Sequence, residues 1–171
     1  MLNKEVVIVC DMWKILKIHG PAKIACANVG ISDSDLSTEV SAFSVWLNHN
    51  LNLIRRDFDI IHVANGKEIQ DCIDTHNDQV VPHMRNVSTH YDKYYFCGMH
   101  LGRCIHQYAI ELGKSVDKDK IGVVFNLSLL FPTDNYNRIR DSHPLGPQYR
   151  FTMYNYVRSI KGFTTDCAPK N

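Results

Sequence analysis

Two side chains in this sequence could take part in chemistry at the ends of predicted strands, namely the carboxylate of Asp11 and the thiol of Cys104. Asp11 comes directly after an apolar run at residues 6–10. Cys104 lies in the turn that follows a second apolar run, at residues 94–98. In open parallel sheets, ligands bind beyond the carboxyl ends of the strands, where both side chains are expected. The sequence therefore singles out Asp11 and Cys104 as candidate functional residues at this edge of the sheet.

The turn around Cys104 favours a reactive thiol. The segment Gly98-Met99-His100-Leu101-Gly102-Arg103-Cys104 joins a predicted strand to a predicted helix, which puts Cys104 near a helix N-terminus. Unpaired N–H groups and the positive end of the helix dipole stabilise a thiolate there, and the same N–H groups can hold an oxyanion. The alternative for Cys104 is simple packing, and the alternative for Asp11 is capping of the segment that follows it.

Further side chains are candidates for the wall of a pocket at this edge. For Trp13 and His100, core packing is the alternative, and Leu101 stands beside His100 in the turn. His62 lies within a predicted buried strand, where it could contact a substrate or serve as a hydrogen-bonded core residue. The spacing of Cys97, His100, Cys104 and His106 superficially suggests zinc, but a strand residue and a helix residue are not expected to converge on one ion. No metal is therefore expected.

Alternating strands and helices would position these residues. Continuous apolar, β-branched runs predict strands at 5–10, 58–64, 94–98 and 120–126, with a weaker one at 79–84. Apolar residues at spacings of three and four predict helices at 36–54, 105–112 and 149–160, with a shorter one at 68–75. The polar cluster at 32–35 can supply the N-cap of the first helix. The pattern predicts one domain, 1–171, with a three-layer α/β/α fold and a mainly parallel sheet with helices on both faces.

Composition excludes several classes of function. The 171 residues are 44% hydrophobic and 22% charged, as is usual for a globular domain, and 19 basic residues nearly balance 18 acidic ones. No strong field attracts nucleic acid, and no apolar run approaches the roughly 20 residues that span a bilayer. The N-terminus has no secretion signal, so we expect a cytoplasmic protein whose six cysteines are thiols.

The two motifs resemble those of the isochorismatase-like cysteine hydrolases, a superfamily that includes nicotinamidases and carbamoyl-sarcosine amidases. The matching stretches are Val6-Val7-Ile8-Val9-Cys10-Asp11-Met12-Trp13 and Phe96-Cys97-Gly98-Met99-His100-Leu101-Gly102-Arg103-Cys104-Ile105, and the order of elements fits from about residue 4 to 126. The resemblance implies an Asp–Lys–Cys triad that hydrolyses a C–N or related bond of a small metabolite. It makes Asp11 the base and Cys104 the nucleophile, and it implies a homo-oligomer that needs no organic cofactor.

The sequence departs from the family at the triad lysine. The family places that lysine between the second strand and the cysteine, but here Val80-Val81-Pro82 is followed by His83. The candidate cations are His83, Lys67 and Arg85. Two hypotheses follow, namely a cysteine hydrolase or an inactive relative that binds a small ligand or acts as an oligomeric scaffold. The aromatic segment 149–156 is a candidate interface between copies.

Overall fold

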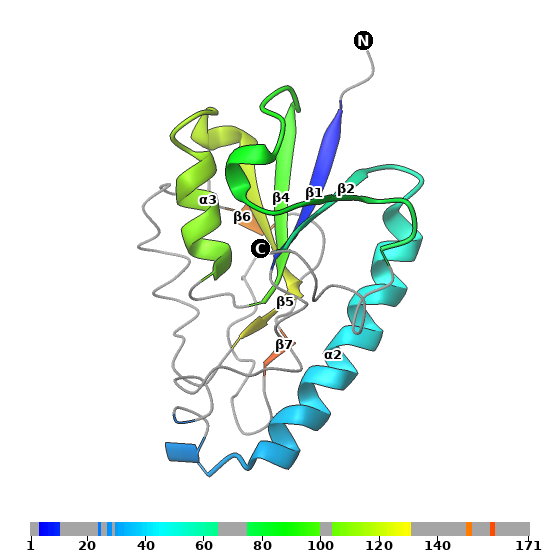
Figure 1. The fold of residues 1–171 in the computed structure, drawn as a ribbon, viewed down its shortest axis with the longest axis vertical. Helices are drawn as coiled ribbons and strands as arrows, with labels where there is room; N and C mark the ends of the chain where they lie inside the picture. The colour runs from blue at the N-terminus through cyan, green and yellow to red at the C-terminus, as the bar shows by residue number, and fades with distance from the viewer. Residues whose placement is uncertain are drawn as a thin grey trace.

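A computed structural model describes residues 4–10, 24, 27–28, 30–64, 75–99, 104–130, 150–151 and 158–159 (Figure 1). Every pairing between the described strands is parallel. The order across the sheet is β3 (Gln79–Val81), β2 (Asp59–Val63), β1 (Glu5–Cys10), β4 (Lys93–Gly98), β5 (Ile121–Leu130) and β6 (Arg150–Phe151), with β7 (Arg158–Ser159) paired to β5.

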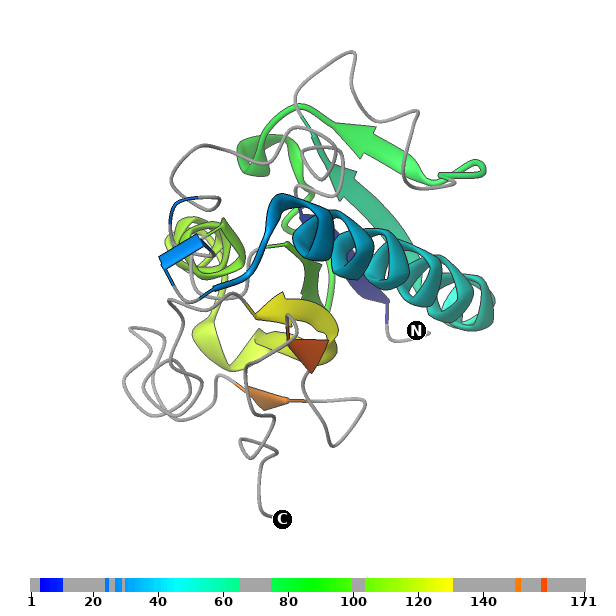
Figure 2. The same ribbon diagram turned by 90° about the horizontal axis from the view of Figure 1, so that it is seen from below.

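Two helices cover opposite faces of this sheet (Figures 1 and 2). The long helix α2 (Asp33–Ile54) begins at Ser32, whose side chain accepts a hydrogen bond from the Asp35 backbone N–H at 3.1 Å, as the polar cluster predicts. The short helix α3 (His106–Leu112) ends at Gly113 and packs on the other face beside the 3-10 helix η3 (Met84–Asn86). A second 3-10 helix, η5 (Lys118–Lys120), leads into β5. The mainly parallel sheet with helices on both faces confirms the predicted α/β fold.

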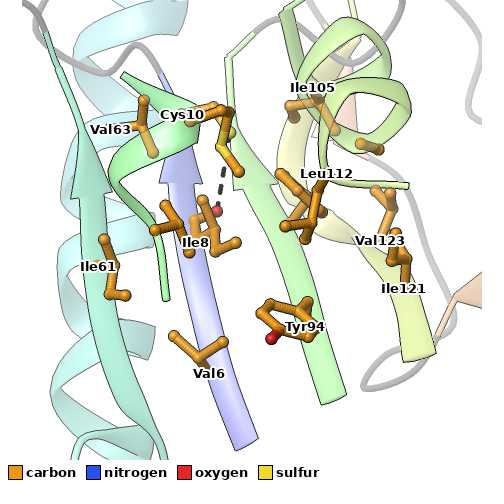
Figure 3. Packing of buried hydrophobic residues seen from close by; sticks show 14 of the residues in the cluster. Val6, Ile8, Cys10, Ile61, Val63, Tyr94, Ile105, Leu112, Ile121 and Val123 are labelled. Atoms are coloured by element: carbon orange, nitrogen blue, oxygen red, sulfur yellow. Dashed lines mark hydrogen bonds between the residues drawn. The ribbon is translucent and has the colours of Figure 1, made fainter. Parts of the chain in front are cut away.

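Strand β1 shows how the sequence builds the two cores. Its side chains alternate, so Ile8 and Cys10 belong to the cluster under α3, whereas Val7 and Val9 belong to the cluster under α2. Figure 3 shows Ile8 and Cys10 facing the same space as Ile105, at the start of α3. Because β1 is buried on both sides, nearly every residue in it must be apolar, and each such side chain stabilises the fold by about 1.5–3 kcal/mol.

Some predicted elements differ from the structure. Residues 150–151 and 158–159 are strands, so the predicted helix at 149–160 is wrong at these positions, where backbone pairing with β5 prevails over the apolar spacing. Strand β3 ends at Val81 because Pro82 has no N–H to donate. Strand β5 extends to Leu130, beyond the predicted end. The predicted helix at 68–75 lies outside the described residues except for Thr75.

Within the described part of the chain, no helix has the length and apolarity required to cross a membrane.

Candidate functional site

The order of the strands reverses between β1 and β4. From β1 the chain continues to β2 and β3 on one side, and it then returns to add β4 and β5 on the other side. The helix after β1 covers one face, and the helix after β4 covers the opposite face. In open α/β sheets such a reversal leaves a crevice at the carboxyl ends of the two strands, which is the usual place for a ligand. The sequence positions of Asp11 and Cys104 follow these two strand ends.

Gly98 holds the two strand ends unusually close together. Its φ of +103° lies in a region that side chains disfavour, and a Cβ there would lie 2.5 Å from the Cys10 carbonyl oxygen. The next residue, Met99, donates its backbone N–H to the same oxygen at 2.9 Å. The residue that precedes Asp11 is therefore fixed against the start of the turn that leads to Cys104.

Strand β5 is irregular beside this junction. Phe96 pairs with Val123, but Gly98 pairs with Ser128, so β5 bulges between these two pairs. The fully buried Ser128 donates its hydroxyl to the Val124 carbonyl at 2.8 Å across the bulge. Bulges next to active sites commonly re-aim the backbone, and this one reshapes the edge where β4 ends.

Cys104 lies in a single π-type turn just before α3, together with Ile105. Ile105 is fully buried and anchors this turn, whereas Cys104 is half-buried. Among the described cysteines, Cys10 and Cys97 are completely buried, and burial raises the pKa of the Cys97 thiol. Cys104 is therefore the described thiol that solvent and a small reagent can reach.

Two of the three candidate cations lie in the segment that packs on α3. His83 precedes η3 and Arg85 lies within it, and both side chains are exposed. A cavity of about 630 Å³ between η3 and α3 is lined by Arg85 and by His106, whose pKa is lowered by burial. The structure thus brings Arg85 to the helix that begins just after Cys104.

Five of the predicted site residues lie outside the described residues, namely Asp11, Trp13, Lys67, His100 and Leu101.

His62 is a hydrogen-bonded core residue, which is the second of the two alternatives that the sequence left open for it, rather than part of the pocket wall. It belongs to a buried polar cluster whose other members were not predicted from the sequence. Its Nε2 lies 2.9 Å from Oδ2 of Asp78, and Arg55 donates to both oxygens of the same carboxylate, from Nη2 at 2.7 Å and from Nε at 3.1 Å. The side chains of His62, Asp78 and Arg55 are 4%, 10% and 18% exposed. The Arg55 guanidinium also donates to Asn52, whose Oδ1 lies 3.0 Å from His76 Nε2.

The charge of Asp78 is compensated by the other members of this cluster. Burial by itself would raise the pKa of Asp78, but the hydrogen bonds and charges of His62 and Arg55 hold it below its ordinary value. A cavity of about 530 Å³ beside Arg55 and Asp78 is also lined by His76, which has a positive φ of 45°. Since the carboxylate is saturated by protein donors, the cluster ties the end of α2 to β2 and β3. The sequence does carry one signal for this cluster, because a histidine within a predicted buried strand needs a polar partner.

The described residues contain no group of side chains arranged to hold a metal ion. Cys97 belongs to the core under α2, while α3 packs on the opposite face, so Cys97 is separated by the sheet from the helix that carries His106. The chain matches no protein-family model, and no curated protein or solved structure is significantly similar to it. A function for this chain can therefore be inferred only from its residues and their geometry.

Proposed function

We propose that this protein is a cytoplasmic cysteine hydrolase that cleaves a C–N or related bond of a small metabolite, at the edge where β1 and β4 end. Cys104 is the nucleophile, Asp11 is the base, and no organic cofactor takes part. The proposal extends the resemblance to isochorismatase-like hydrolases, and it makes the pocket wall from Trp13, His100 and Leu101.

The observation that carries this proposal is the closed junction between Gly98 and Cys10 at the point where the strand order reverses. The two backbones lie so close together that a Cβ on Gly98 would come within 2.5 Å of the Cys10 carbonyl oxygen, so this arrangement requires glycine. Asp11 is bonded to one strand end, and the turn to Cys104 starts from the other. A general base must come within hydrogen-bond reach, or one water, of the proton that it removes, and this junction favours such an approach.

The proposed reaction needs only the two side chains, the substrate and water. The Cys104 thiol passes its proton to Asp11, and the thiolate adds to the substrate carbonyl. Collapse of the tetrahedral adduct breaks the C–N bond, while the proton on Asp11 returns to the leaving amine. Water then adds to the thioester, which releases the acid and restores the thiol. Backbone N–H groups in the turn before α3 are the natural donors to the developing oxyanion.

The triad cation in this proposal comes from the segment that packs on α3. His83 and Arg85 are the described candidates, and Lys67 is the third. Neither described position carries the lysine that the resemblance implies, and an arginine does not transfer protons at ordinary pH. We therefore expect slow hydrolysis of ordinary family amides such as nicotinamide, well below the roughly 10 per second of a typical enzyme.

The proposal is tested by following hydrolysis of a panel of small amides, with mass spectrometry of quenched samples to detect the acyl-enzyme. Slow turnover and an acyl group on Cys104 are expected, and Cys104→Ala should lose both. The matched control is Cys97→Ala, which removes a fully buried thiol on the face of the sheet opposite to α3 and should keep the activity once its fold is verified by circular dichroism.

Two outcomes would overturn the proposal. Saturable binding of a panel member without turnover or acylation would favour the inactive, ligand-binding alternative. Turnover that persists in Cys104→Ala would exclude Cys104 as the nucleophile.

A further inference from the structure

The outer face of α2 carries a run of side chains that the fold itself does not explain. From residue 40 to residue 54 the helix contains no aspartate, glutamate, lysine or arginine. The inner side of α2 is buried against the sheet, but Val45 and Leu53 point outward with 72% and 55% of their surfaces exposed. Four turns of surface helix without a full charge are unusual, because solvent-facing positions are normally charged or polar.

These outward residues form a seam with the period of a coiled coil. Exposed positions follow one another at spacings of three and four, which keeps them on one side of the helix. The seam consists of Asp35, Thr38, Ala42, Val45, His49, Leu53 and Arg56. Its middle combines the apolar Ala42, Val45 and Leu53 with the uncharged polar Thr38 and with His49, and one charged seam residue lies near each end.

The charges at the two ends of the seam have opposite signs. Asp35 lies in the first turn of α2, next to Asp33, whereas Arg56 follows directly after the helix. Arg56 is 83% exposed and pairs with the neighbouring Asp57, also on the surface, so this ion pair is weak and can be exchanged for another. A second helix with the same pattern, laid antiparallel, would place acid against base at both ends.

We propose that the outer face of α2 binds the α2 of a second copy of this chain, in an antiparallel pair with two-fold symmetry. In this register Val45 of each copy lies beside the symmetry axis. Ala42 then faces His49 of the second copy, and Asp35 faces its Arg56. A two-fold interface uses the same patch on both copies, so a seam complementary to itself when reversed is the required pattern. This inference does not depend on the proposed hydrolase activity.

The size of the seam sets the strength of the pair. A helix of 22 residues is about 33 Å long, and one helix face supplies only part of the roughly 800 Å² per partner of a standard interface. We therefore expect a dimer that dissociates on dilution, with twice the 19.6 kDa mass of the chain at high concentration.

The first test is sedimentation velocity of the full chain over a wide range of concentration. Val45→Glu brings two like charges together at the symmetry axis and should raise the dissociation constant at least about tenfold. Ser37→Glu is the matched control, because Ser37 is exposed on the same helix but lies off the seam. It adds the same charge and should leave the dimer unchanged.

The second test exchanges the end charges. Asp35→Arg and Arg56→Asp should each weaken the dimer, because each puts like charges opposite one another. The double variant should restore it, which a general effect on folding would not do. Val45→Cys should also give a disulfide between the two copies of position 45, and Ser37→Cys should not.

Three results would overturn the inference. One is a monomeric wild type at every concentration, which would leave the face of α2 to a different protein. Another is a dimer that Val45→Glu does not weaken. The last is a dimer that depends instead on the aromatic segment 149–156.

Discussion

Two regions of this protein contain side chains of the types that enzymes use, but the two regions are built differently. Around Asp78, a carboxylate is buried with a histidine and an arginine, and each partner lies within 3.2 Å of it. Around Gly98, the contacts are between backbones, and the nearby turn presents the half-buried Cys104. The first region consists of ionisable groups that pair with one another, and the second is a tight backbone scaffold that leaves the Cys104 thiol partly exposed.

The comparison shows that a set of catalytic residue types is not by itself a catalytic site. The histidine, aspartate and arginine are residue types common in active sites, but here they form hydrogen bonds with one another. They therefore stabilise the packing of the end of α2 against β2 and β3. The junction of β1 and β4 lies where ligands bind in open α/β sheets. The predictions below separate these two roles.

The largest effect is expected from Gly98→Ala. The new methyl group would meet the Cys10 carbonyl oxygen at 2.5 Å, and alanine is strained at a φ of +103°. The two costs together should lower the free energy of unfolding by about 3–5 kcal/mol, as measured by urea denaturation. The matched control is Gly30→Ala, since Gly30 has a φ of +79° but no atom near the added methyl group. The control should cost only about 1–2 kcal/mol, and equal losses in the two variants would contradict the close approach.

Asp78→Ala should have the next largest effect. It leaves Arg55 and His62 buried without their shared carboxylate, which should cost about 3 kcal/mol of unfolding free energy. Asp57→Ala removes a carboxylate from an exposed ion pair with Arg56 and should cost no more than about 0.5 kcal/mol. If the two variants lose the same stability, the Asp78 cluster is not the structural anchor described here.

The stabilisation from Asp78 should also depend on pH. Because its pKa in the folded protein lies below the value of about 3.9 in the unfolded chain, stabilisation by the carboxylate is complete above that value. It is lost as the pH falls through the lower, folded pKa. The stability difference between the wild type and Asp78→Asn should therefore be constant near neutral pH and shrink below about pH 4. A difference that does not change down to pH 3 would exclude a lowered pKa.

A smaller effect is expected from His83→Lys. A lysine carries a permanent charge at neutral pH and is the residue that the family resemblance implies for the triad, so this variant should raise amide turnover at pH 7 at least about tenfold, which corresponds to about 1.4 kcal/mol. Arg85→Lys is the control, because it only replaces one cation with another in the same segment and should change turnover little. A gain in Arg85→Lys alone would assign the role to position 85.

The fold could be predicted because its strands are buried on both faces. Continuous apolar runs such as Val6 to Cys10 have few other structural interpretations, and the apolar spacing of α2 with Ser32 before it fixes a helix start. The helix predicted at 149–160 is wrong at residues 150–151 and 158–159, because apolar residues at helical spacing do not exclude short strands. There, pairing with β5 decides the structure, and such pairing is not visible in a local pattern.

The candidate site was predicted less completely. The sequence indicates the strand after which each reactive residue comes, and the sheet order then makes these strands neighbours. It does not reveal the Gly98 contact with Cys10, because a close approach depends on register. Nor does it reveal that Asp78 would reach across to His62, sixteen positions earlier in the chain. Contacts between separate elements are set by packing rather than by spacing.

The most direct test of the central claim is peptide-resolved alkylation of the native protein between pH 6 and 7. If Cys104 is the nucleophile, its thiol should react rapidly with iodoacetamide, while the buried Cys97 should react only after unfolding. Rapid, selective labelling of Cys104 is the result that we predict. If Cys104 reacts no faster than Cys97 under native conditions, the thiol is an inert packing residue and the proposed hydrolase mechanism is wrong.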